Sequence, residues 1–141
     1  MLADERILAT VRGWIEKAEN DLKNASLTLG AGEDCPADTV AFHAQQCAEK
    51  YLKALLAMQS VDFPKTHDLA VLIALLPARP AIKLSVEEQR RLTSYATVTR
   101  YPGDYEPVTS AEARQAVALA RRVRKHVRSL LPKAALKPRR S

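Results

Sequence analysis

The sequence contains few of the residues that make tight turns, and it lacks any long hydrophobic run. Glycine occurs only four times in 141 residues, which disfavours a many-turned β-fold. No stretch approaches the ~18 consecutive apolar residues of a membrane span. The two cysteines, Cys35 and Cys47, have neither CxxC nor zinc-finger spacing. The first 14 residues lack the apolar segment of a signal peptide. We therefore expect a cytoplasmic protein without a disulfide, with Cys47 acting as a small core residue.

What the sequence does contain is a balance of apolar and charged residues typical of one soluble domain. Apolar residues make up 47% and charged residues 27%. The net charge of +6 has a local origin: nine of the 22 basic residues lie in 121–141, where no acid occurs. Residues 1–120 contain the other 13 basic residues and all 16 acidic residues, so the positive charge is concentrated at the C-terminal end. Such a basic end suits a polyanion or an acidic partner. It is equally compatible with a solvated helix end. We expect one domain over 1–132 and a disordered basic tail over 133–141.

Apolar residues separated by three and four positions predict an all-α protein. Long helices are expected over 4–29, 38–59 and 109–131, with a short helix over 66–76. A helix of medium length is expected to begin after Ser85. Short connections between long amphipathic helices favour antiparallel neighbours. The predicted architecture is therefore an up-down bundle of four to five helices.

Helix starts are marked by local capping patterns. Ser85 and Glu88, and likewise Thr109 and Glu112, have the spacing of a capping box. Thr66 is the expected N-cap of the short helix. Each of these residues therefore predicts where one helix begins.

The second predicted helix carries a polar face. Positions separated by three, four and three residues project from the same side of a helix, and here they hold His43, Gln46, Lys50 and Lys53. Gln45 and Glu49 form a second row beside them, and Glu49 has the spacing to pair with Lys53. The face indicates either packing against a partner or a solvated surface with ordinary salt bridges.

The most unusual local sequence lies between the last two helices. It combines a cation, two aromatic rings and a rigid turn, in the order Arg100, Tyr101, Pro102, Gly103, Asp104 and Tyr105. An arginine can fork onto a phosphate, and a tyrosine can stack on a base. Alternatively, the tyrosines cover the bundle end and Arg100 pairs with a carboxylate. The chemistry of these residues favours neither interpretation over the other.

The histidines do not form a recognisable metal or catalytic motif. His43, His67 and His126 lack HExxH spacing, and no glycine-rich phosphate loop is present. His67 follows Thr66, and Asp68 stands where a negative charge favours a helix dipole. We expect no metal and no cofactor.

Four separated segments, 14–25, 41–56, 65–69 and 99–106, resemble a HEPN domain, in the right order over nearly all of 8–131. The resemblance implies a four-to-five-helix bundle that commonly forms a two-fold homodimer. Small prokaryotic members are often encoded beside a minimal nucleotidyltransferase, in pairs regarded as toxin–antitoxin systems. The residues expected at family motifs or interfaces are His43, Gln46, Glu49, Lys50, His67, Asp68 and Pro102.

Many HEPN proteins are metal-independent ribonucleases whose motif is an arginine followed, after four to six residues, by a histidine. Arg100 takes the arginine position, but no histidine stands at any allowed position, and Tyr105 occupies the first of them. A phenol with a pKa near 10 is a poor general base at neutral pH. Arg121 and His126 also have the spacing, but late in an arginine-rich helix, where such a match arises easily.

The resemblance leads to three functional hypotheses. The first is a nucleotide- or RNA-binding component of a two-protein system with a minimal nucleotidyltransferase, binding through the Arg100 loop at a dimer cleft. The second is a ribonuclease toxin with Arg100 and Tyr105 as catalytic candidates, and the third is a non-catalytic dimeric scaffold. In some paired toxins the partner modifies a tyrosine near the motif, which makes Tyr101 or Tyr105 the candidate. The expected binding residues are Arg100, Tyr101, Asp104, Tyr105 and Lys53.

Overall fold

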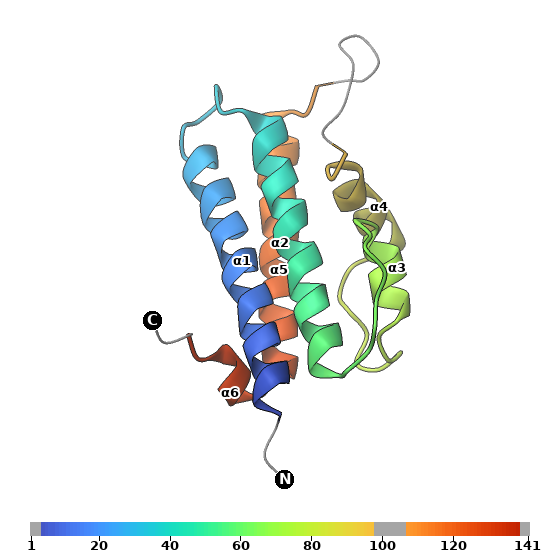
Figure 1. Cartoon of the computed structure of the whole chain (residues 1–141). Helices are drawn as coiled ribbons and strands as arrows, with labels where there is room; N and C mark the ends of the chain where they lie inside the picture. The colour runs from blue at the N-terminus through green and yellow to red at the C-terminus, as the bar shows by residue number, and fades with distance from the viewer. Residues whose placement is uncertain (1–3, 98–106, 139–141) are drawn as a thin grey trace.

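The computed structural model describes residues 4–97 and 107–138, and this part of the chain contains helices and no strand (Figure 1). The helices are α1 (Glu5–Leu29), α2 (Ala37–Met58), α3 (Leu69–Ala74), α4 (Val86–Ser94), α5 (Ser110–Leu130) and α6 (Lys133–Leu136). Helix α1 runs opposite to both α2 and α5, which share one direction because the α3–α4 segment carries the chain back between them (Figure 1). Helix α5 lies behind α1 and α2, and the α3–α4 pair lies beside α2 (Figure 1). The predicted all-α, up-down bundle is confirmed.

Local capping sets the starts of α4 and α5, as the sequence predicts. The Ser85 hydroxyl accepts from the Glu88 backbone N–H at 3.0 Å, and the Glu88 carboxylate accepts from the Ser85 N–H at 2.9 Å. Thr109 and Glu112 form the same reciprocal pair at 3.0 and 3.4 Å. Two otherwise unpaired backbone donors are satisfied at each helix start.

The start of α3 differs from the prediction. Its N-cap is Asp68, whose carboxylate accepts from the Ala70 N–H at 3.0 Å. The hydroxyl of Thr66 accepts instead from the Asp68 N–H at 3.1 Å, which makes a turn before the helix. Between them, the ring of His67 binds Glu49 of α2. This long-range contact keeps residues 66–67 out of the helix.

The core lies around α2, which is buried on most of its circumference because α1, α5 and the α3–α4 pair surround it. Cys47 is fully buried there, as predicted. The buried apolar side chains of α1 are Leu8, Val11, Ile15, Ala18, Leu22 and Ala25, spaced by three and four residues, whereas Ile7 and Trp14 are only half-buried at the edge of this face.

Part of the predicted disordered tail forms α6 and packs against α1. The Arg12 guanidinium donates from Nε and Nη2 to the Ala134 carbonyl at 3.0 and 2.6 Å, and Ala135 is buried. Arg12 and Ala134 are 122 residues apart, so no local pattern marks this contact. Among the described helices, none combines the length and apolar character needed to cross a membrane.

Candidate functional site

The polar residues of α2 divide into two clusters on different sides of the helix. His43 and Lys50 contact α1, whereas Gln46 and Lys53 belong to a network that reaches the segment before α3. Positions 43 and 50, like 46 and 53, are seven residues apart and therefore nearly superimpose along the helix. The predicted single polar face is thus two faces, and neither is a simple solvated surface.

The first cluster is built around Asp21 of α1, which is 8% exposed. Its carboxylate lies 2.8 Å from His43 Nδ1 and accepts from Lys50 Nζ at 2.5 Å. Asp21 is not among the predicted site residues, although its position in the sequence marks it. Asp21 stands three residues after Ala18 and four before Ala25, within the apolar stripe of α1. An acid at such a position needs partners on the neighbouring helix.

The second cluster, which we call the Glu49 cluster, consists of Gln45, Gln46, Glu49, Lys53 and His67. The Glu49 side chain is only 3% exposed, and its Oε2 accepts from Lys53 Nζ at 3.0 Å. Its Oε1 accepts from Gln45 Nε2 at 3.1 Å and lies 2.7 Å from His67 Nδ1. Gln46 donates to the Gln45 amide oxygen at 2.6 Å. The predicted Glu49–Lys53 pair is confirmed, and every member has hydrogen-bond partners.

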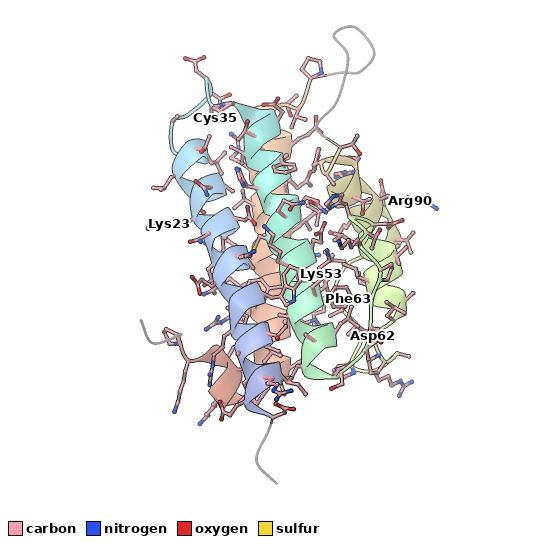
Figure 2. All side chains as sticks on the ribbon, in the orientation of Figure 1. Lys23, Cys35, Lys53, Asp62, Phe63 and Arg90 are labelled. Atoms are coloured by element: carbon pink, nitrogen blue, oxygen red, sulfur yellow. The ribbon has the colours of Figure 1, made fainter. Side chains whose placement is uncertain are left out.

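Lys53, which is predicted from the sequence as a binding residue, is engaged in contacts within the protein. Its side chain is 9% exposed, and its ammonium lies 5.4 Å from the ring centroid of Trp14 and 5.8 Å from that of Phe63. Lys53 and Phe63 lie side by side between α2 and the segment that leads to α3 (Figure 2). The two rings meet edge to face at 6.2 Å. Lys53 is therefore part of the packing between α1, α2 and this segment.

His67 is the exposed member of the Glu49 cluster. Its side chain is 64% exposed, although Nδ1 is bonded to the buried Glu49 carboxylate. Because a carboxylate only accepts, Nδ1 carries the proton in this bond, which leaves Nε2 as an acceptor in the neutral ring. Two residues later, the Leu69 N–H donates to Thr93 Oγ1 of α4 at 3.1 Å. The chain that carries His67 thus contacts α4 near its C-terminal end, two residues after the imidazole.

The ends of α4 and α5 are tied together where the chain passes between them. The buried Tyr95, just after α4, donates through its hydroxyl to Glu112 Oε2 in the first turn of α5, at 3.0 Å. The connection therefore leaves and returns at one end of the bundle. The predicted site residues of this connection lie outside the described residues; they are Arg100, Tyr101, Pro102, Asp104 and Tyr105.

The basic residues of α5 point in several directions. Arg122 donates to the Glu88 carboxylate at 2.9 Å, and Arg124 forms a two-pronged pair with Glu19 of α1 at 2.8 Å. Arg121 donates to the Ser26 hydroxyl at 2.8 Å. His126 accepts instead from the Lys83 N–H, so Arg121 and His126 contact different elements and form no joint site.

Burial, followed by the charge of Lys83, lowers the pKa of His126, which agrees with a neutral acceptor nitrogen. Across residues 4–97 and 107–138, no three histidine, cysteine, aspartate or glutamate side chains gather as a metal-binding group. In the described part of the chain, the strongest polar constellations are therefore the Glu49 cluster, the Asp21 cluster and the basic side of α5.

Comparison with known proteins places this bundle in a class of small helical domains. The family model described as HEPN domain matches residues 11–130. The crystal structure of TT1696 from Thermus thermophilus is 31% identical, with a TM-score of 0.69, and the match covers 86% of this chain and 98% of that one. The structure of ST0689, an archaeal HEPN homologue, is 28% identical, with a TM-score of 0.66, covering 85% and 96%. No curated protein matches the chain.

The chain belongs to the HEPN family, as its four sequence segments indicate. Members of this family are generally linked to nucleotides or RNA, and they commonly dimerise. The family match extends from residue 11, in the first third of α1, to the end of α5, so it includes both clusters and the α4–α5 connection.

Proposed function

We propose that this protein is a nucleotide- or RNA-binding component of a two-protein system, and that it binds through the Arg100 loop at a dimer cleft. The observation that carries the proposal is the 3.0 Å hydrogen bond between Tyr95 and Glu112. It joins the two ends of the connection that contains Arg100, and capping boxes fix the starts of both flanking helices. Such a scaffold holds a short binding loop on rigid elements.

A substitution pair tests the loop directly. Purified protein is incubated with total RNA or tRNA, and binding and cleavage are measured for the wild type, Arg100→Ala and Arg90→Ala. Arg90 is an exposed arginine of α4 (Figure 2), so its variant controls for the loss of one positive charge. We expect Arg100→Ala to weaken binding at least about tenfold, the effect of losing a charge-assisted pair. Equal binding by the two variants would contradict the proposal.

A homodimer is part of the proposal, and apolar exposure on α3 supports it. Val71 of this helix and Leu75, its C-cap residue, stand four residues apart and are 39% and 38% exposed. Side chains with this spacing share a helix face, and α3 packs beside α4, which leads to the loop. Sedimentation at micromolar concentration is expected to give twice the 15.6 kDa chain mass. A monomer would contradict this part of the proposal, because the cleft requires two copies of the chain.

The second component is expected to be a minimal nucleotidyltransferase, as in the paired systems that the family resemblance implies. Inspection of the neighbouring reading frame, followed by co-purification of its product, tests this part. A neighbour of another kind that fails to co-purify would leave nucleotide or RNA binding standing without the toxin–antitoxin role.

His67 supports a second candidate function, that of a metal-independent ribonuclease. The family histidine after Arg100 is missing, but the Glu49–His67 pair supplies an imidazole whose tautomer is fixed by a buried carboxylate. An imidazole held in this way is suited to removing the proton of a ribose 2′-hydroxyl, with an arginine stabilising the phosphorane charge. Leu69, two residues after His67, donates its backbone N–H to Thr93 near the end of α4, which leads to the segment containing Arg100.

Cleavage of tRNA by His67→Gln tests the second candidate, with His126→Gln as the matched control. Loss of about 100-fold or more in rate for the first variant alone is the size expected of an acid–base group. If the wild type cleaves no RNA, or if His67→Gln cleaves as fast as the control, the ribonuclease hypothesis is wrong and binding alone remains.

A further inference from the structure

A groove of about 740 Å³ between α1 and α5 is lined mainly by basic side chains. Five of the eight lining residues are cations, one is acidic, and none is aromatic. The cations are Lys23, Arg121, Arg124, Lys125 and Arg128. Lys23 lies on the outer side of α1 (Figure 2), and the other four come from α5. The groove therefore concentrates positive charge from two helices far apart in the sequence.

The single acid of the groove is already engaged by one of the cations. Glu19 binds Arg124 through both carboxylate oxygens at 2.8 Å. Burial raises the pKa of Glu19, but hydrogen bonds from Arg124 and Tyr51 and the nearby arginine charges outweigh it, so the pKa is lowered. Glu19 is thus ionised and compensates Arg124, which leaves the other four cations without a counter-charge among the lining residues.

Apart from Arg124, the cations that α5 contributes to the groove are arranged in a row. Arg121, Lys125 and Arg128 occupy positions i, i+4 and i+7, which share one helix face. At 1.5 Å per residue they span about 10 Å, the axial length of about three nucleotides in one strand. Arg121 is held across the groove by the Ser26 hydroxyl of α1 at 2.8 Å. Part of the row is therefore fixed before any ligand arrives.

We propose that this groove binds the phosphodiester backbone of an RNA strand without reading its bases. The row of cations matches a chain of regularly spaced anions, and the lack of an aromatic lining residue leaves no surface on which a base would stack. Arg121 lies 11 residues, or about 16 Å along the axis, from the first residue of α5, so the groove is separate from the end of α5 that follows the connection. This inference deepens the proposed function, on which it rests, by naming the backbone as a ligand at a second surface.

Fluorescence anisotropy with a 5′-labelled oligouridylate of about 12 nucleotides tests the proposal at several KCl concentrations. The groove variant carries Lys23→Gln, Arg121→Gln and Lys125→Gln, which leaves Arg124 and Arg128 in their contacts with Glu19 and Tyr51. The matched control removes three positive charges elsewhere; it carries Lys65→Gln, Arg79→Gln and Arg90→Gln, all at exposed positions.

We expect the groove variant to lose at least about tenfold in affinity near 100 mM KCl, and the slope of log K against log salt to fall by about 2, since each phosphate contact on a single strand contributes about 0.7. The control is expected to lose less than about threefold, through long-range attraction alone. Circular dichroism and urea unfolding confirm that both variants are folded.

Equal losses in the two variants would overturn the proposal, because net charge alone would then explain binding. Failure of the wild type to bind the oligonucleotide would overturn it too, and would favour an acidic protein as the occupant. Arg100→Ala separates the two inferences. Binding lost in Arg100→Ala and kept in the groove variant rejects the groove and supports the loop, and the reverse result rejects the loop and supports the groove.

Discussion

Removal of the Glu49 carboxylate is expected to destabilise this protein severely. Glu49 and Lys53 are 3% and 9% exposed in their side chains, and their charged atoms lie 3.0 Å apart. In Glu49→Ala the ammonium of Lys53 stays in a confined site beside Trp14 without its carboxylate. Breaking a buried ion pair by removing one partner costs about 3–5 kcal/mol. For a chain of this size, that loss corresponds to a fall in Tm of roughly 10 °C or more.

Urea unfolding followed by circular dichroism measures the loss, with Glu87→Ala as the control. Glu87 also has a cation four residues away, Arg91, but its side chain is 83% exposed and the pair is 3.5 Å apart. We expect the control to change the free energy of unfolding by less than about 0.5 kcal/mol. The contrast isolates burial, because both variants remove one glutamate from a helix.

A double variant separates the uncompensated charge from the lost packing. Glu49→Met with Lys53→Met removes both charges and keeps apolar volume beside Trp14 and Phe63. It is expected to recover at least about half of the stability lost in Glu49→Ala, because an apolar pair of similar volume often replaces a buried ion pair without penalty. A loss below about 1 kcal/mol for Glu49→Ala would refute the reasoning.

Three further predictions concern single residues. The pKa of Glu19 is lowered against the opposing effect of burial, so its ionised form stabilises the fold above its ordinary pKa of 4.5, and this contribution is lost as pH falls through the lower folded value. Glu19→Gln should therefore cost about 0.5–1 kcal/mol at pH 7 and progressively less in unfolding curves below pH 4.5. Thr109→Ala removes the N-cap of α5 and should cost about 1 kcal/mol in urea unfolding; an unchanged midpoint would contradict the cap. Burial raises the pKa of Cys47, so in Cys35→Ser a thiol reagent at pH 8 should label Cys47 only at the rate of unfolding, and rapid labelling of native protein would contradict its burial.

Features that depend on neighbours in the sequence were predictable. The capping boxes at Ser85 and Thr109 involve residues three positions apart, and both form as predicted. The Glu49–Lys53 pair is likewise local, since its members stand four residues apart on one helix. The four HEPN-like segments gave the family, because their order reflects the whole bundle.

Features decided by distant contacts were not predictable from these patterns. The division of the polar face of α2 depends on Asp21 of α1, and α6 depends on Arg12. The N-cap of α3 is Asp68 and not the predicted Thr66, because His67 binds Glu49, 18 residues earlier. The Arg100 loop stays a prediction, since it lies outside the described residues.

The docking of α6 on α1 has a practical consequence for work with this protein. The beginning of α1 and the chain after α6 emerge at the same end of the bundle, whereas α4 leads to α5 at the opposite end (Figure 1). The described residues nearest to the two termini therefore lie at the end of the bundle opposite to the start of α5 (Figure 1). Fusions intended to report on loop binding can be built at both termini, but a fusion that displaces Lys133–Leu136 would also release the Arg12 side chain.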